Sequence, residues 1–424
     1  MATPSRRLYG LGAVMTAALL VCSRIKGPVG GPLYLGCLAV ACVAYLFAIR
    51  EWMRTPKYPR HVLLVSLAMA AAWRVPFLLA PPGPQDDVLR YVWDGRLQHL
   101  GYNPYTALPS DPALAKLHTP ETRQMNNPDL PSPYPPGAQM FFKTITAIHE
   151  SAFAFKAAFA ACDLAILLLL LADLRWSGLG EHWALAYAWH PLLVPCVAYN
   201  GHIDILGALL LLISAMSLRR CWRACAAITL GLAIAVKFLP IVLAPLYWRR
   251  VRIRDGLLAA LLVALLYAPF VNHGTIPLGS LGVFVQRFRF NGPVFGVIER
   301  ALPPQAAAGL AVLSGLLTAA WIRRRWPAPS LHAWAWPMAV ALAAAPVVYP
   351  WYLLWLVPFL VPGVALPLMI WTLSILSVFF VWYSHALGGP WQVPDWTLWL
   401  EYGSVAIAAA IAFVRRRRVA RKTE

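Results

Sequence analysis

The sequence predicts an all-α protein, a polytopic bundle of about 13–14 transmembrane helices with a large outer loop that carries short helices. Three observations support this fold class. Of the 424 residues, 60% are hydrophobic and only 12% are charged, about half the charged fraction of a soluble protein. Apolar runs of roughly 15 to 20 residues recur along the whole chain. One long polar segment, residues 81–150, interrupts them.

The basic residues indicate the orientation of the bundle rather than a nucleic-acid partner. The net charge is +19, and Lys and Arg are concentrated in short clusters between apolar runs, at residues 50–60, 219–223, 249–254, 323–325 and 415–422. Cytoplasmic loops have this pattern and contact anionic lipid. We therefore expect membrane lipid as a partner, no nucleic acid, and both ends of the chain on the cytoplasmic side.

The first half of the chain divides into two helical units around the long loop. The N-terminal unit, residues 1–80, has apolar runs near 8–23, 31–49 and 61–80. We expect the first run to be an uncleaved span, because no A-x-A site follows it. The central unit, residues 151–271, has runs near 152–173, 183–199, 202–218 and 256–271. Residues 222–248 are basic at both ends, so we expect two short helices with a break at Lys237-Phe238-Leu239-Pro240.

The second half repeats this alternation. An outer loop, residues 272–303, precedes a C-terminal unit, residues 304–424, with runs near 304–322, 331–348 and 398–414 and a basic cytoplasmic tail. Residues 351–383 predict a short half-helix that ends near Pro358 to Gly363, followed by a full span. This topology places residues 81–150, the hinge 199–202, residues 272–303, and residues 346–352 with 384–395 on the outer side. A catalytic site is expected there, because the cytoplasmic loops are short and basic.

The outer loop begins with a predicted acidic helix. Pro84 and Gln85, followed by two acids, form a typical helix start. Asp87, Tyr91 and Asp94 then share one helix face, and Asp86 is expected to reach Arg90 at i+4. A purely structural alternative exists for Asp86 and Asp87, since acids cap helices and complement their dipole.

Aromatic residues and acids together suit a sugar site, because rings pack on flat apolar faces and carboxylates bind hydroxyls. Tyr91, Tyr105 and Tyr134 belong to this loop, although an interfacial aromatic belt is the alternative. A carboxylate near the lipid boundary is well placed as a general base, which takes a proton from an acceptor hydroxyl that attacks an anomeric carbon. Partial burial and a second acid raise the pKa of such a base.

Several basic residues are candidates for a phosphate site. Arg287 and Arg289 flank Phe288 in QRFRFNG, which suits a phosphate below an isoprenoid chain, although contacts with lipid headgroups are the alternative. Lys237 lies in an apolar region, where a charge is costly, and is expected to contact phosphate or to pair with Asp204. We expect His202 and Asp204 to form a polar hinge with too few ligands for a metal. Arg74 and Asp163, both inside predicted spans, are expected to pair.

At these residues the chain resembles the membrane-embedded glycosyltransferases of the GT-C class. It is most similar to polyprenyl-phosphate-mannose-dependent mannosyltransferases of bacteria and to related anchor-assembly enzymes of eukaryotes. The stretches that carry the resemblance are DDVLRYVWDGRLQHLGYNPY (86–105), YPPG (134–137), YNGHIDILGALLLL (199–212), AVKFLPIVLAPL (235–246) and YPWYLLWLVPF (349–359). The resemblance implies a GT-C-like fold, a donor sugar on polyprenyl phosphate, an active site facing away from the cytoplasm, and inversion. It also implies an acid of the first outer loop as catalytic base, which maps to Asp86 or Asp87.

The expected function is transfer of a hexose, mannose or a similar sugar, from a polyprenyl-phosphate donor to a lipid or glycan acceptor at the outer, periplasmic face of a bacterial inner membrane. A transporter or flippase of a lipid-linked substrate is the main alternative, and a polysaccharide polymerase or ligase is another. No metal and no further cofactor are expected. The candidate catalytic residues are Asp87 and Asp86. The candidate substrate-binding residues are Arg90, Tyr91, Asp94, Tyr105, Tyr134, His202, Asp204, Lys237, Arg287 and Arg289.

Overall fold

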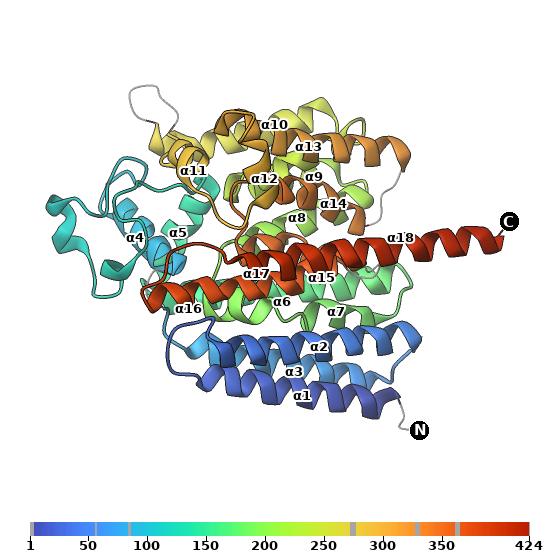
Figure 1. Ribbon diagram of the computed structural model, residues 1–424. Coiled ribbons are helices and arrows are strands. Elements are labelled where there is room, and N and C mark those ends of the chain that lie inside the picture. Colours follow the sequence, from blue (N-terminus) through green and yellow to red (C-terminus); the bar gives the residue numbers. More distant parts are fainter. Residues whose placement is uncertain are drawn as a thin grey trace.

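The protein is a helical bundle with one polar end. The computed structural model describes residues 4–423 except 56, 84–85, 272–276, 327–330 and 361–364. Within these residues it has no β-strand, only an isolated parallel bridge between Phe290 and Val347. The long helices run along a common direction, with α4 and α5 at one end of the bundle and the start of α1 and the end of α18 at the other (Figure 1). The all-α fold class predicted from the sequence is confirmed.

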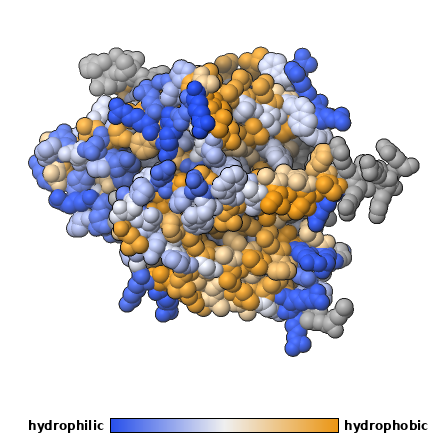
Figure 2. Space-filling model, in the orientation of Figure 1, coloured by the Kyte–Doolittle hydropathy of each residue, from blue (hydrophilic) through white to orange (hydrophobic). Residues whose placement is uncertain are grey.

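The protein is a multi-pass membrane protein. Among the described residues, 7 helices are long and apolar enough to cross a membrane: Pro32–Arg54, Arg60–Leu79, Ala152–Trp176, Ile253–Phe270, Pro304–Arg325, Leu366–Ala386 and Asp395–Arg415. Figure 2 shows hydrophobic residues over the middle of the bundle, with hydrophilic residues over the end that holds α4 and α5 and at the opposite helix ends. Apolar side chains on the outside of the bundle suit a lipid environment, because the hydrocarbon core of a bilayer contains no water that could solvate polar groups.

Three helices at the N-terminus lie side by side (Figure 1): α1 (Pro4–Arg24), α2 (Pro32–Arg54) and α3 (Arg60–Leu79). A buried ion pair joins this unit to α6 (Ala152–Trp176). Arg74 Nε lies 2.5 Å from Asp163 Oδ2, and the Tyr187 hydroxyl donates to Asp163 Oδ1 at 2.6 Å. The pairing of Arg74 with Asp163 predicted from the sequence is therefore confirmed.

The outer loop carries short helices, as expected. They are α4 (Asp87–His99), the 3₁₀ turns η1 (Pro112–Leu117) and η2 (Thr122–Gln124), and α5 (Pro136–Ile148). α4 packs against α5 through aromatic rings, since Tyr91 stacks on Phe142 with ring centres 4.5 Å apart. Gly95 allows the close approach, because a Cβ there would meet the backbone oxygen of Phe142 and the side chain of Thr146.

Proline shortens several of the spans that the apolar runs predict. Residues 183–199 form a 3₁₀ turn η3 (Glu181–Ala184), α7 (Leu185–Ala188) and a π turn η4 (Val194–Tyr199) instead of one long helix. Pro191 and Pro195 lack the N–H that a continuous helix requires. The predicted break at Lys237 is confirmed: α9 (Arg223–Val236) ends there, and the 3₁₀ helix η5 (Leu239–Tyr247) follows.

The remaining helices complete the bundle. They are α8 (Asp204–Arg219), α10 (Ile253–Tyr267), η6 (Ala268–Phe270), α11 (Leu281–Arg287), α12 (Pro293–Ile298), α13 (Pro304–Arg325), η7 (Leu331–Trp334), α14 (Ala335–Ala343), η8 (Pro350–Trp355), η9 (Val357–Leu360), α15 (Leu366–Ser374), η10 (Ile375–Phe379), α16 (Phe380–Ala386), α17 (Asp395–Leu398), η11 (Trp399–Gly403) and α18 (Ser404–Thr423). The half-helix predicted to end near Pro358 to Gly363 corresponds to η8 and η9, which contains Pro358, whereas Gly363 lies outside the described residues.

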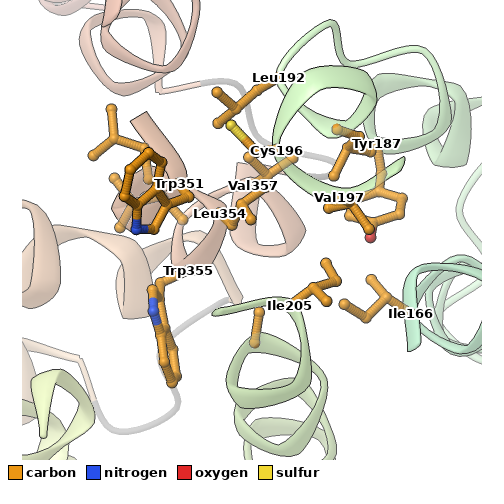
Figure 3. Packing of buried hydrophobic residues seen from close by; sticks show 14 of the residues in the cluster. Ile166, Tyr187, Leu192, Cys196, Val197, Ile205, Trp351, Leu354, Trp355 and Val357 are labelled. Carbon is orange, nitrogen blue, oxygen red and sulfur yellow. The ribbon is translucent and has the colours of Figure 1, made fainter. Parts of the chain in front are cut away.

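The core lies where short helices of different units meet. Figure 3 shows Tyr187 of α7, Cys196 and Val197 of η4, Ile205 of α8, and Trp351, Leu354 and Trp355 of η8 in this core. Gly207 of α8 allows η8 to approach, because a Cβ there would overlap the ring of Trp355. This packing brings the hinge before α8 next to η8, where the candidate site lies.

Candidate active site

A cavity of about 600 Å³ lies between the outer loop and the helix ends below it. All four polar segments that the sequence places on the outer side contribute to its lining. They supply Asp86, Asp87 and residues 125–128, 130–131 and 133–135 of the loop, Asn200 and His202 of the hinge, Arg287 and Arg289 of the second loop, and Tyr349, Trp351, Tyr352, His385 and Trp391 of the fourth segment. Trp382 of α16 lines the cavity as well. Lys237 and Phe238, at the break between α9 and η5, also line the cavity.

Asp86 anchors the start of the outer loop to the hinge. It is the residue before the first turn of α4 and is 8% exposed. Its Oδ2 accepts a hydrogen bond from the backbone N–H of Gly83 at 2.7 Å, and its Oδ1 accepts one from Asn200 Nδ2 at 3.0 Å. Burial raises the pKa of Asp86 to about 7 and the neighbouring charge of Asp87 adds to this, although the Gly83 bond and Lys156 oppose it.

Asp87, the first residue of α4, has a different environment. Its Oδ1 accepts a hydrogen bond from Asn126 Nδ2 at 2.8 Å, and its Oδ2 lies 3.5 Å from His202 Nδ1. Burial acts to raise the pKa of Asp87, but the nearby His202 imidazole, the hydrogen bond from Asn126 and the charge of Lys237 outweigh it and lower the pKa. Asp87 is therefore ionised near neutral pH, and its side chain retains 18% exposure.

The helix start differs from the prediction in one contact. α4 begins at Asp87, as the acidic pattern indicates, whereas Pro84 and Gln85 lie outside the described residues. The expected contact from Asp86 to Arg90 is wrong, because Asp86 turns toward Gly83 and Asn200. Arg90 Nε instead pairs with Asp94 Oδ1 at 2.9 Å, and Arg90 Nη2 donates to the backbone oxygen of Leu130 at 2.8 Å.

Lys237 forms an ion pair with Asp204, which is one of the two roles predicted for it from the sequence. Lys237 Nζ lies 2.8 Å from Asp204 Oδ1 and 3.7 Å from the centre of the Tyr352 ring. Trp355 Nε1 donates to the same Asp204 oxygen at 2.7 Å. Asp204 is buried below the cavity, whereas Lys237 lines it and keeps 23% side-chain exposure. The pair thus holds one ammonium group at the cavity wall.

The two arginines of the second outer loop line the cavity with different partners. Arg289 Nε pairs with Glu299 Oε2 at 2.7 Å, and its guanidinium lies 4.8 Å from the centre of the Phe295 ring. Arg287 is exposed and has no carboxylate partner within the part of the chain that the structure describes. Arg287 is therefore the cation with the greater freedom to bind an anion.

The tyrosines and the third acid of the loop fall into two groups. Tyr134 lines the cavity. Tyr91 and Asp94 are buried behind it, Tyr91 against Phe142 and Asp94 within reach of Ser132 Oγ at 2.5 Å and Gln139 Nε2 at 3.0 Å. Tyr105 is also buried and donates to the backbone oxygen of Tyr134 at 2.8 Å. These three residues support the wall rather than form it.

An aromatic stack forms a wall of the cavity beside Asp87, and the sequence analysis did not assign it to the site. His202 stacks on Trp351 with ring centres 3.8 Å apart, and Trp351 stacks on Tyr349 at 4.5 Å. The aromatic residues of the YPWY stretch could have indicated this wall. Asn126 and Asn200, which contact the two acids, carried no such signal because their partners are distant in sequence.

The described residues include no group of three or more His, Cys, Asp or Glu side chains that could hold a metal ion. An ionised carboxylate can accept a proton, Lys237 and Arg287 can bind an anion, and flat aromatic faces can hold a sugar ring.

Comparison with known proteins places this site in a family context. Residues 9–250 match the family model described as alpha-(1->6)-mannopyranosyltransferase, N-terminal domain. The match covers more than half of the chain and includes Asp86, Asp87, His202 and Lys237. No curated protein gives a significant match. Among solved structures, ArnT from Cupriavidus metallidurans bound to undecaprenyl phosphate is similar with a TM-score of 0.44 and 17% identity, over 85% of this chain and 73% of that chain.

Proposed function

Because the chain belongs to the alpha-(1->6)-mannopyranosyltransferase family, we propose that it transfers a hexose, mannose first among the candidates, from a polyprenyl phosphate to a lipid or glycan acceptor. The family match confirms the GT-C mannosyltransferase resemblance predicted from the sequence, and the chain is a membrane glycosyltransferase. The observation that carries the proposal is the ionised Asp87, which shares one cavity with Lys237 and Arg287.

The proposed reaction is a single displacement. The acceptor hydroxyl attacks the anomeric carbon while Asp87 takes its proton. The bond between that carbon and the phosphate oxygen breaks, and polyprenyl phosphate leaves with the electron pair. Lys237 and Arg287 bind the phosphate that carries the released charge. A single displacement inverts the anomeric carbon, and cations from the protein itself make a metal unnecessary, so we expect EDTA to leave the rate unchanged.

Asp87 is a better candidate for the base than Asp86. A base must first lie close enough to the acceptor hydroxyl to remove its proton, and the pKa of the base matters only when this geometry is met. Both oxygens of Asp86 already accept hydrogen bonds, and the residue is 8% exposed. Asp87 keeps 18% side-chain exposure next to the cations. Asp86 then positions the loop that presents Asp87.

We further propose that the cavity faces the periplasm of a bacterial inner membrane. The basic clusters at 219–223 and 323–325 lie at the C-terminal ends of α8 and α13, whereas the cavity opens at the ends where α4 and α8 begin. Basic loops remain cytoplasmic. Labelling single cysteines introduced in the loop 103–132 of a cysteine-free variant, in intact cells, tests this orientation; protection until the cells are broken would reverse it.

A transfer assay tests the proposed function. Purified protein in liposomes receives radiolabelled polyprenyl-phosphate-mannose and a membrane extract as a source of acceptors. Sugar is expected to move to a new product with the native protein and not with Asp87→Asn. If no sugar is transferred while the lipid-linked donor crosses the vesicle membrane, the protein is a flippase and the proposal fails.

A further inference from the structure

A buried carboxyl group connects the C-terminal span to the outer segment that carries Arg287. Glu401 lies in the π turn η11 and is 0% exposed. Its Oε1 accepts hydrogen bonds from Trp371 Nε1 at 2.6 Å and Asn291 Nδ2 at 3.2 Å, and its Oε2 lies 3.0 Å from Asn291 Nδ2. A buried carboxyl group is costly unless hydrogen-bonded, and π turns inside helices are frequent at functional sites.

Asn291 joins three parts of the chain. Its φ of 54° places it in the left-handed region, which is uncommon for a residue with a side chain. Its Nδ2 also lies 3.2 Å from the backbone oxygen of Val348, and its backbone oxygen accepts a hydrogen bond from the Tyr402 hydroxyl at 2.8 Å. Glu401 and Tyr402 of the C-terminal span thus hold one asparagine from both its side chain and its backbone.

The two segments joined at Asn291 are two walls of the cavity. The preceding residue, Phe290, donates its N–H to Pro346 O at 3.0 Å and accepts a hydrogen bond from the Val348 N–H at 2.9 Å. Its ring packs against Tyr349 with centres 4.5 Å apart. Arg287 lies four residues before Asn291, and Tyr349 follows Val348 directly. A shift of Asn291 would therefore move the cationic wall relative to the aromatic wall.

We infer that Glu401 is a positioning residue that acts through Asn291 to fix Arg287 relative to the aromatic wall, and so sets the affinity for the phosphate of a lipid-linked donor. This inference rests on the proposed function. Glu401 lies outside residues 9–250, where the family model matches, so it is assigned from the geometry of this chain alone.

The chemistry of the contact supplies a specific variant. The two carboxyl oxygens face donors only, from Asn291 Nδ2 and Trp371 Nε1. Glu401→Gln replaces one acceptor with an N–H group, which must face one of these donors. Thr372→Val is the matched control, since Thr372 is 0% exposed and hydrogen-bonds His190 and Met369 without contacting Asn291 or Glu401.

The test measures binding of undecaprenyl phosphate without a sugar to the purified full-length protein, together with hydrogen exchange of the Phe290 and Val348 amides. We expect Glu401→Gln to raise Kd about tenfold, as for a lost buried hydrogen bond, and to speed exchange at both amides. Thr372→Val should lower Tm with Kd and exchange unchanged.

The inference is overturned by a Glu401→Gln Kd equal to that of the native protein, or by unchanged exchange at Phe290 and Val348. An equal rise of Kd in Thr372→Val also overturns it, because the effect would then be a general loss of stability. Absence of lipid binding by the native protein is a separate result, which contradicts the proposed function itself. The amide exchange, which needs no ligand, then decides whether Glu401 holds the segment.

Discussion

Replacing Asp87 by asparagine tests the assignment of the base. Asparagine has the size of aspartate, and its oxygen can still accept the bond from Asn126, but it cannot take a proton from the acceptor. Loss of a general base slows a reaction about 10²- to 10⁴-fold, which corresponds to roughly 3–5 kcal/mol of barrier. We expect Asp87→Asn to lower kcat/KM by this factor. Asp86→Asn should lower it by less than about tenfold, because Asp86 acts on the position of the loop.

The pH dependence separates the two acids, because their pKa values shift in opposite directions. Burial raises the pKa of Asp86 from 3.8 to about 7, so its ionised fraction falls as pH drops through 7. If Asp86 were the base, kcat/KM at pH 5.5 would be about 30-fold below its plateau. The pKa of Asp87 is lowered below 3.8, so Asp87 stays ionised at pH 5.5 and at pH 8. We therefore expect kcat/KM at pH 5.5 and pH 8 to agree within about threefold.

The assay follows initial rates with labelled donor in liposomes at constant ionic strength. Asp129→Asn is the control for removing a charge from the loop, since Asp129 is exposed and does not line the cavity. A fall of about 30-fold at pH 5.5 in the native protein, together with a loss of activity in Asp86→Asn at pH 8 as large as that expected for Asp87→Asn, would move the base to Asp86. Full activity of Asp87→Asn would refute the reasoning for both the base and its accessibility.

Three further variants test the binding of the donor and the packing of the bundle. Arg287→Ala should weaken binding of undecaprenyl phosphate about tenfold in titration calorimetry; unchanged affinity would remove this cation from the site. Asp163→Asn leaves Arg74 without its charged partner and should cost roughly 3 kcal/mol, seen as a lower Tm; an unchanged Tm would contradict a structural role for the pair. Gly207→Ala should lower Tm because its Cβ meets a tryptophan ring, whereas Gly256→Ala, with open space around it, should not; equal effects would contradict the packing argument.

The sequence predicted those features of the fold that depend on local pattern or on strong energetic rules. The break at Lys237 follows from a nearby proline and from basic residues at both ends of one apolar run. The pair of Arg74 and Asp163 follows because charges inside a membrane seek partners. The conversion of residues 183–199 into short turns was missed, because apolar composition cannot distinguish a spanning helix from short helices packed inside the protein.

The candidate site was predictable where residues are close in sequence and hidden where partners are distant. The acids at the start of α4 stand out as a polar cluster, but their division of roles depends on Asn126 and Asn200. Asn200 is 114 residues from Asp86, and no local pattern joins them. The sequence spacing places Asp94 on the same helix face as Asp87. In the structure, however, α5 covers Asp94, which is buried behind the cavity wall.

The distribution of partners couples the docking of the outer loop to the chemistry. The loop supplies both acids, whereas the hinge supplies His202 and the membrane helices supply Lys237. The bond from Asn200 to Asp86 ties the loop to the hinge. Asp87 lies beside His202, in the cavity that Lys237 lines, only when the loop rests on the helices. Docking of the loop therefore forms the cavity and places the base next to the cation in one step.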